Sequence, residues 1–197
     1  MNEPDRLWQP VSPPLQQLLL EYSRDLLFWR LGFSEEEPRQ PDVAHTGLGL
    51  FVTLRRRGQL RGCIGSITTE ESLVDSVRRR TLDAAFRDTR FPPLAAAELE
   101  GGRTLALEHS VLSPLQSIGD VREIRLGTDG VVLTIGSHRG VFLPEVPLEQ
   151  GWSVPVMMDR LAGKAGLPAD RWRRADARFQ VFQTQHYQGE IRGPGGV

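Results

Sequence analysis

The fold is decided by residues 49–65, which read Gly49-Leu50-Phe51-Val52-Thr53-Leu54-Arg55-Arg56-Arg57-Gly58-Gln59-Leu60-Arg61-Gly62-Cys63-Ile64-Gly65. Apolar residues recur at every second position in the first half, at Leu50, Val52 and Leu54, which is typical of a β-strand with two different faces. Arg57-Gly58 is a turn pair, after which the chain returns over residues 59–64. The segment therefore predicts a β-hairpin with Cys63, the single cysteine, on its second strand.

Helical patterns lie on both sides of this hairpin. Ser12-Pro13 is typical of a helix start, and apolar residues follow at helical spacing up to residue 32. Thr68 and Glu71 fit a capping box, which predicts a second helix over 68–86. A third helix is expected over 153–166, where Gly166 and a following proline mark its end.

Further strands are expected over 104–111, in a hairpin over 131–143, and over 179–182. Because hairpins dominate and helices do not alternate regularly with strands, we expect an α+β fold with a mainly antiparallel sheet flanked by helices. The expected domain covers 13–187. Residues 1–12 are expected to form a loose leader, and the Gly- and Pro-rich residues 188–197 a disordered tail.

Composition argues against several classes of protein. A net charge of −1 gives no general attraction to nucleic acid or to an anionic membrane. The arginine runs 55–57 and 78–80 are better explained as a solvated turn and a solvated helix face. One cysteine and four scattered histidines argue against structural zinc, so no metal site and no cofactor are expected. No apolar run approaches the ~20 residues of a membrane span, and we expect a cytoplasmic protein.

Cys63 is the first candidate for chemistry. In a regular strand Arg61 and Cys63 share a face, and a neighbouring cation lowers the pKa of a thiol. Gly62 and Gly65 flank the cysteine, and glycine inside a strand indicates a bulge or a close approach to the backbone, including approach by a ligand. The alternative is that Cys63 is a small buried hydrophobe, with the glycines making room for a crossing helix.

Other polar residues could complete a site around Cys63. Glu108 and Ser110 share one face of the strand 104–111. If this strand pairs near the hairpin, Arg61, Cys63, Glu108 and Ser110 form a polar patch that orients a substrate; the alternative is an ordinary solvated sheet face. Asp88 and Arg90 form either a local ion pair or part of the same site, and with Gly62 and Gly65 they are the candidate binding residues.

The four histidines give no partner for Cys63. A nucleophilic cysteine normally needs a base, most often histidine. His109 lies among leucines on the apolar face of its strand, which favours a place in the core. His138 lies in a predicted turn, His45 in a loop and His186 near the tail, and none has a spacing that connects it to Cys63.

These segments, in this order, resemble the AMMECR domain family, whose bacterial members include AmmeMemoRadiSam system protein A. The resemblance covers about residues 13–187, and the chain is assigned with those bacterial members. The matching stretches are Gly49 to Leu54, Gly58 to Gly65, Ala85-Phe86-Arg87-Asp88-Thr89-Arg90-Phe91-Pro92-Pro93-Leu94, Glu108 to Pro114, Gly140 to Val146, Glu149 to Trp152, and Lys164 to Pro168.

The resemblance implies a larger and a smaller lobe, with Leu60 to Gly65 near the groove between them. It also implies association with a Memo-type protein and a radical-SAM protein in a modification or redox pathway. The chain departs from the family at His109, usually apolar, at Thr89, often proline, and at Ala162, a cysteine in some members. Two functions remain open: a binding or adaptor component that takes an unknown small molecule or peptide, and an enzyme that uses Cys63 as a reactive thiol.

Overall fold

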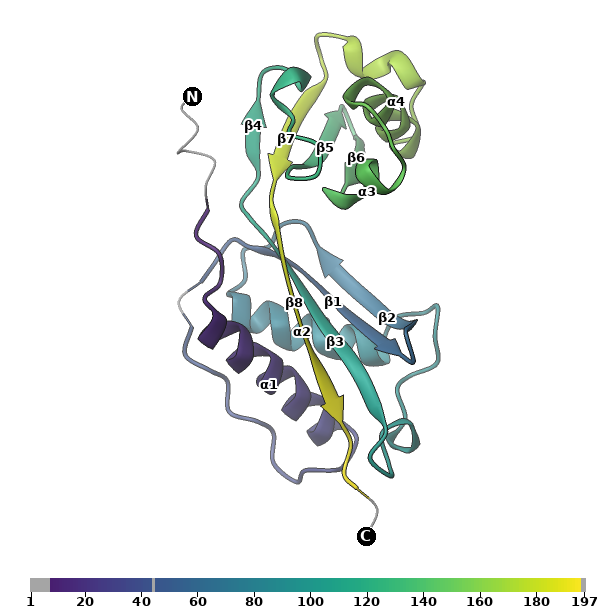
Figure 1. The fold of residues 1–197 in the computed structure, drawn as a ribbon. Helices are drawn as coiled ribbons and strands as arrows, with labels where there is room; N and C mark the ends of the chain where they lie inside the picture. Colours follow the sequence, from purple (N-terminus) through teal and green to yellow (C-terminus); the bar gives the residue numbers. More distant parts are fainter. Residues whose placement is uncertain (1–7, 44, 196–197) are drawn as a thin grey trace. The chain divides into compact units, whose positions relative to one another are not determined.

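The computed structural model describes residues 8–43 and 45–195, and the chain forms two compact units (Figure 1). The larger unit comprises residues 9–112 together with the chain from 185 onward, and the smaller comprises residues 113–184. Each unit contains a four-stranded sheet and helices. The α+β prediction, with a mainly antiparallel sheet and a smaller β-containing part, is confirmed.

The sheet of the larger unit has the strand order β2-β1-β3-β8. Its elements are α1 (Pro13–Arg30), β1 (Gly49–Arg56), β2 (Gln59–Ser66), α2 (Leu73–Phe86), the short 3-10 helix η2 (Ala96–Glu98), β3 (Thr104–Leu112) and β8 (Thr184–Arg192). Helix α2 packs on β1 and β2 and against α1. The two helices therefore cover one face of the sheet (Figure 1).

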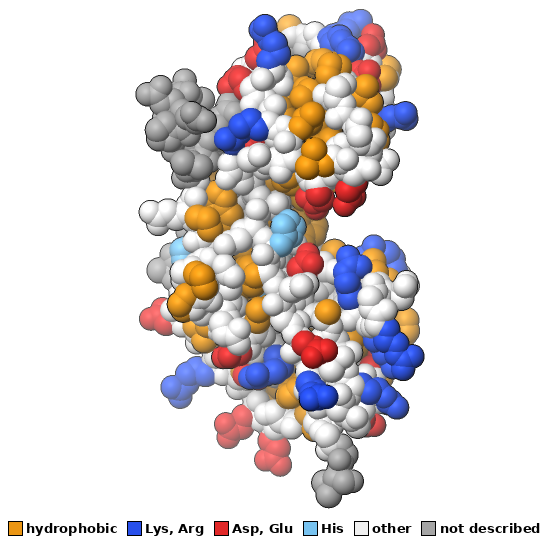
Figure 2. All heavy atoms as spheres, viewed as in Figure 1, with side chains coloured by type: hydrophobic (Ala, Val, Ile, Leu, Met, Phe, Trp, Pro, Cys, Tyr) orange, Lys and Arg blue, Asp and Glu red, His pale blue; other side chains and the backbone are white. Residues whose placement is uncertain are grey.

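The predicted hairpin β1–β2 is confirmed, and β3 pairs antiparallel with the other side of β1. Val52 pairs with Ile64 and His109, whereas its neighbour Thr53 pairs with Cys63 and Glu108. Since successive side chains of a strand point to opposite faces, these two rows lie on opposite sides of the sheet. Basic side chains gather around the end of this hairpin (Figure 2), as expected for a solvated arginine turn.

The core of the larger unit lies between the helices and the Val52 row. Leu50, Val52 and Leu54 of β1 are fully buried, and so are Leu105, Leu107 and Val111 of β3. From the helices, Leu19, Leu26, Leu27, Val77 and Ala84 complete this core. Alternation along β1 and β3 thus assigns every second residue to the core, as the sequence indicates.

The smaller unit has a second antiparallel sheet with the order β4-β7-β5-β6. Its elements are β4 (Gln116–Ile118), the 3-10 helix η3 (Val121–Glu123), β5 (Gly130–Ile135), β6 (His138–Phe142), α3 (Glu145–Glu149), α4 (Val154–Lys164), the 3-10 helix η4 (Ala169–Arg173) and β7 (Arg178–Phe182). Met157, Met158 and Leu161 of α4 pack on Val131 and Leu133 of the sheet. The predicted hairpin and third helix are confirmed.

Three predictions about element ends need correction. The second helix begins at Leu73 rather than near Thr68, because Ser72 is the residue whose hydroxyl accepts from Asp75 N–H. The tail prediction is wrong over 188–192, where β8 continues beside β3. The predicted leader lies outside the described residues up to residue 7, and Val11 is buried with its N–H bonded to the Gln185 side chain.

Within the described ranges, no helix is both long enough and apolar enough to cross a membrane. Strands β4 and β8 and helix α3 are absent from the prediction. Pro147 lies within α3, and residues 184–188 read Thr-Gln-His-Tyr-Gln, so neither segment has a strong apolar period.

Candidate functional site

Five polar side chains lie on the face of the larger sheet that α1 and α2 do not cover. Thr53 pairs with both Cys63 and Glu108, which places those two residues on its own face. Ser110, two residues after Glu108, shares that face. His186 of β8 contacts Ser110. We call this set the polar row: Thr53, Cys63, Glu108, Ser110 and His186.

Hydrogen bonds connect the polar row in two groups. Thr53 Oγ1 donates to Cys63 Sγ over 3.3 Å. Ser110 Oγ donates to Glu108 Oε1 over 3.2 Å and lies 3.0 Å from His186 Nδ1. Thr53 and Ser110 are buried, Cys63 and Glu108 are half-buried, and His186 is exposed. The row therefore combines fixed hydroxyls with side chains that solvent or a ligand reaches.

The arrangement of Ser110, His186 and Glu108 is not that of a Ser-His-acid triad. A triad needs serine and acid at opposite ring nitrogens. Here Glu108 Oε1 lies 3.6 Å from His186 Nδ1, the same nitrogen that contacts Ser110. A hydroxyl carries one hydrogen, so Ser110 Oγ cannot donate to Glu108 and to His186 Nδ1 at the same time. Serine and carboxylate therefore meet at one ring nitrogen, which is not the order of a triad.

Arg61 does not join the polar row. The register between β1 and β2 shifts after Leu54, which pairs with Gly62, while Arg55 pairs with Leu60. Arg61 is the extra residue of this β-bulge, and bulges redirect side chains. Its guanidinium donates to both carboxylate oxygens of Glu98, over 2.9 and 2.8 Å, and this contact lowers the pKa of Glu98. The expected sharing of a face by Arg61 and Cys63 is wrong, because the bulge interrupts the alternation.

Asp88 and Arg90 hold the backbone of Cys63 instead. Strand β2 is an edge of the sheet, so the peptide groups of Cys63 need partners beyond β1. Cys63 N–H donates to Asp88 Oδ2 over 2.9 Å, and Arg90 Nη2 donates to Cys63 O over 2.9 Å. Asp88 and Arg90 also pair with each other over 2.7 Å. These hydrogen bonds, first those from Arg90 and then that from Cys63 N–H, hold the pKa of Asp88 well below its usual range.

Packing accounts for both glycines beside Cys63. A Cβ on Gly62 would lie 2.0 Å from the carbonyl oxygen of Ala84 in α2. A Cβ on Gly65 would lie 2.3 Å from the ring of Phe51 and 2.4 Å from Leu50 O. The alternative in which the glycines make room for a crossing helix is thus correct for Gly62. A role of either residue in ligand binding stays a prediction.

His109 lies in the core, as predicted. It is fully buried, its Nε2 lies 3.0 Å from Ser23 Oγ, and its ring packs edge-on against Tyr187 at 5.2 Å between centroids. Ser23 Oγ also contacts Thr81 Oγ1 at 2.9 Å, so one polar chain connects α1, α2 and β3. Burial lowers the pKa of His109 to about 3.

Thr53 and His186 are the members of the polar row that the sequence analysis does not select. The sequence places His186 near the tail because it does not predict β8. Gln185, Tyr187 and Ile191 give only an incomplete alternation, in which Tyr187 and Ile191 are the buried residues. Among residues 8–43 and 45–195, no three His, Cys, Asp or Glu side chains gather closely enough to hold a metal ion.

These features define a class of protein. It is a two-unit α+β protein with a polar row on one sheet face, and Asp88 and Arg90 bind the backbone of Cys63 at the sheet edge. The chain belongs to the AMMECR1 family, whose model matches residues 21–187. The resemblance drawn from the motifs is therefore confirmed.

Relatives support the same family. A protein of Methanothermobacter thermautotrophicus is 38% identical over 151 residues, which cover 74% of this chain and 77% of that protein. Protein PH0010 of Pyrococcus horikoshii is 34% identical over 179 residues, or 85% of each chain. The crystal structure of that uncharacterized protein matches with a TM-score of 0.73 at 29% identity, over 93% of this chain and 98% of the other. These relatives are archaeal and give no support to the bacterial assignment.

Proposed function

We propose that this protein is a binding component that holds a polar ligand or a partner segment on the polar row. In this proposal it serves a modification or redox pathway, with Memo-type and radical-SAM proteins as partners. The observation that carries the binding role is the convergence of Thr53, Cys63, Glu108, Ser110 and His186 from four strands onto one sheet face. These groups offer hydroxyl, carboxylate and imidazole hydrogen bonds to one bound molecule.

A binding role is favoured over a reactive thiol by the surroundings of Cys63. His186 lies on β8, three strand spacings from β2, which is about 14 Å. That distance is too long for a Cys-His pair, whose atoms must approach to hydrogen-bond distance. Arg61, the cation expected beside the thiol, is bonded to Glu98. Thr53 and Arg90 both interact with the Cys63 side chain, and each is a donor rather than a base at neutral pH.

The experiment measures binding of the purified protein to a Memo-type protein and to a radical-SAM protein from the same organism. Glu108→Gln and His186→Ala should each weaken the complex about tenfold or more, since the first removes a charge and the second removes the imidazole from the proposed interface. Cys63→Ser should leave the affinity within about twofold. If the protein forms a complex with neither partner, the partner assignment is wrong. If both polar-row variants bind with unchanged affinity, the polar row is not the binding surface.

The second candidate is an enzyme that uses Cys63 as a reactive thiol. The half-exposed side chain and the hydroxyl of Thr53 at 3.3 Å favour it, because a donor at sulfur stabilises developing negative charge. Under this candidate Cys63→Ser abolishes pathway output while the partner complex stays intact. The rate of Cys63 alkylation against pH, in the folded and the unfolded chain, separates the two. An accelerated rate in the folded chain supports the enzyme, and protection until unfolding supports the binding component.

A further inference from the structure

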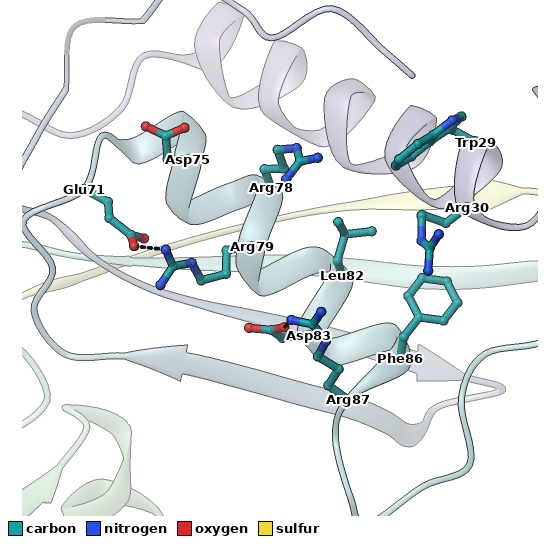
Figure 3. Close-up of a pocket in the computed structure, with 10 residues that line it drawn as sticks. All are labelled: Trp29, Arg30, Glu71, Asp75, Arg78, Arg79, Leu82, Asp83, Phe86 and Arg87. Carbon is teal, nitrogen blue, oxygen red and sulfur yellow. Dashed lines mark hydrogen bonds and ion pairs between the residues drawn. The ribbon is translucent and has the colours of Figure 1, made fainter. Parts of the chain in front are cut away.

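A groove lies on the outer side of the helices of the larger unit, away from the polar row. It runs between the C-terminal part of α1 and the solvent side of α2, and its volume is about 610 Å³ (Figure 3). Ligand pockets of proteins commonly measure ~300–1,000 Å³. We call it the Arg30 groove. The residues that matter for its chemistry are Trp29, Arg30, Arg79, Leu82, Phe86 and Arg87.

Arg30 lies within cation–π distance of two aromatic rings. Its guanidinium carbon lies 5.6 Å from the ring centroid of Trp29 and 5.7 Å from that of Phe86. Figure 3 shows the side chain extending from α1 toward the Phe86 ring of α2. Both distances lie within the range of cation–π attraction, which draws the exposed guanidinium toward the rings. Arg30 therefore places a cation beside apolar surface at the groove.

The other arginines of the groove differ from Arg30 because each has a carboxylate partner. Arg79 pairs with Glu71, Arg87 with Asp83 over 3.1 Å, and Arg78 with Glu37. Within the part of the chain that the structure describes, no carboxylate lies within ion-pair distance of Arg30. Four arginines and three carboxylates line the groove, and Glu37, the partner of Arg78, supplies a fourth negative charge beside it. One guanidinium is thus available to an anion that the chain itself does not supply.

We infer that the Arg30 groove binds a small organic anion in which a carboxylate or phosphate group is joined to a planar apolar body. The oxyanion accepts two N–H bonds from the edge of Arg30, a geometry that a planar guanidinium provides. The apolar body lies against Leu82 and the rings of Trp29 and Phe86. The three carboxylates of the groove restrict the ligand to low negative charge, since a highly charged polyphosphate would meet Glu71, Asp75 and Asp83.

Calorimetric titration with phenyl phosphate and with benzoate tests this site and distinguishes the two oxyanions. Phenol and inorganic phosphate are matched ligands that lack either the charge or the ring. We expect saturable binding of at least one aromatic anion, with a dissociation constant on the order of 1 mM. Phenol and inorganic phosphate should bind at least tenfold more weakly, because each loses one half of the contacts.

Variants locate the binding. Arg30→Ala should weaken the aromatic anion about tenfold, Arg30→Lys less, and Phe86→Leu should reduce the preference for the ring. Arg24→Ala is the matched control, because Arg24 lies on the same helix, is paired with Asp25 and does not line the groove. Thermal unfolding of every variant verifies the fold. Failure of both aromatic anions to bind overturns the inference, and so does binding that Arg30→Ala leaves unchanged.

Discussion

The two faces of the larger sheet use the same strands for different purposes. On the helix side, Val52, His109 and Gly62 face a closed core, and a methyl group added at Gly62 would meet the backbone of α2. On the other side, Thr53, Cys63 and Glu108 lie at adjacent positions of the same three strands, and the side chains of Cys63 and Glu108 remain partly accessible. Adjacent residues of one strand should therefore differ in their tolerance to substitution, with low tolerance on the helix side and higher tolerance on the polar side. The Leu60 to Gly65 motif therefore contains both positions that the fold requires and positions open to a ligand.

The strongest expected contrast concerns Gly62. Gly62→Ala should lower the free energy of unfolding by about 3 kcal/mol or prevent folding, because its Cβ would lie 2.0 Å from Ala84 O and a helix backbone cannot move cheaply. Chemical denaturation measures the loss. Gly163→Ala is the control: this helical glycine has open space around its Cβ, and alanine there should add about 0.5–1 kcal/mol. Equal stability of wild type and Gly62→Ala would contradict the closed helix face.

Asp88 stabilises the edge strand β2 through its hydrogen bond with the backbone of Cys63. Asp88→Ala removes the acceptor for Cys63 N–H and the partner of Arg90. Exchange of the Cys63 amide hydrogen should accelerate roughly 10- to 100-fold, the equivalent of one hydrogen bond to a charged group. Asp88→Asn retains an oxygen acceptor and should give a smaller acceleration. Hydrogen exchange followed by NMR measures the rate. An unchanged rate in Asp88→Ala would show that the hydrogen bonds from Asp88 and Arg90 do not stabilise β2.

His109 should make the free energy of unfolding depend on pH in the acid range. Its pKa is about 3 in the folded protein, against an ordinary 6.5, so the unfolded chain takes up the proton first as pH falls. Its contribution to stability is therefore complete above pH 6.5 and is lost progressively as the pH falls toward 3. Between pH 7 and pH 5 the loss should be about 2 kcal/mol.

His109→Gln removes this titration and is the comparison for it. The free energy of unfolding of wild type should fall more steeply between pH 7 and pH 5 than that of the variant, by the same ~2 kcal/mol. Urea unfolding at several pH values gives both curves. Parallel curves would mean that His109 is protonated in the folded state or that its surroundings adapt to the charge.

The sequence predicts the strands of this comparison well and the contacts between them poorly. Alternation at Leu50, Val52 and Leu54 assigns the faces of β1, and the same alternation assigns His109 to the core. The bulge at Arg61 is invisible to alternation, because a register shift depends on the partner strand. His186 joins Ser110 through a pairing across more than seventy residues, and no local period reports such a contact. Local patterns thus predict elements, whereas the composition of the polar row depends on register.

The smallest expected contrast compares two serines. Ser23 is fully buried on the helix side and contacts Thr81 and His109 there, so Ser23→Ala should cost about 1–2 kcal/mol by leaving buried polar atoms without partners. Ser110 contacts Glu108 and His186, which solvent reaches and can rehydrate, so Ser110→Ala should cost less than about 1 kcal/mol. Denaturant unfolding of both variants at pH 7 measures the difference. A larger loss at Ser110 than at Ser23 would mean that the polar row stabilises the fold, and its residues would then be structural rather than available to a ligand.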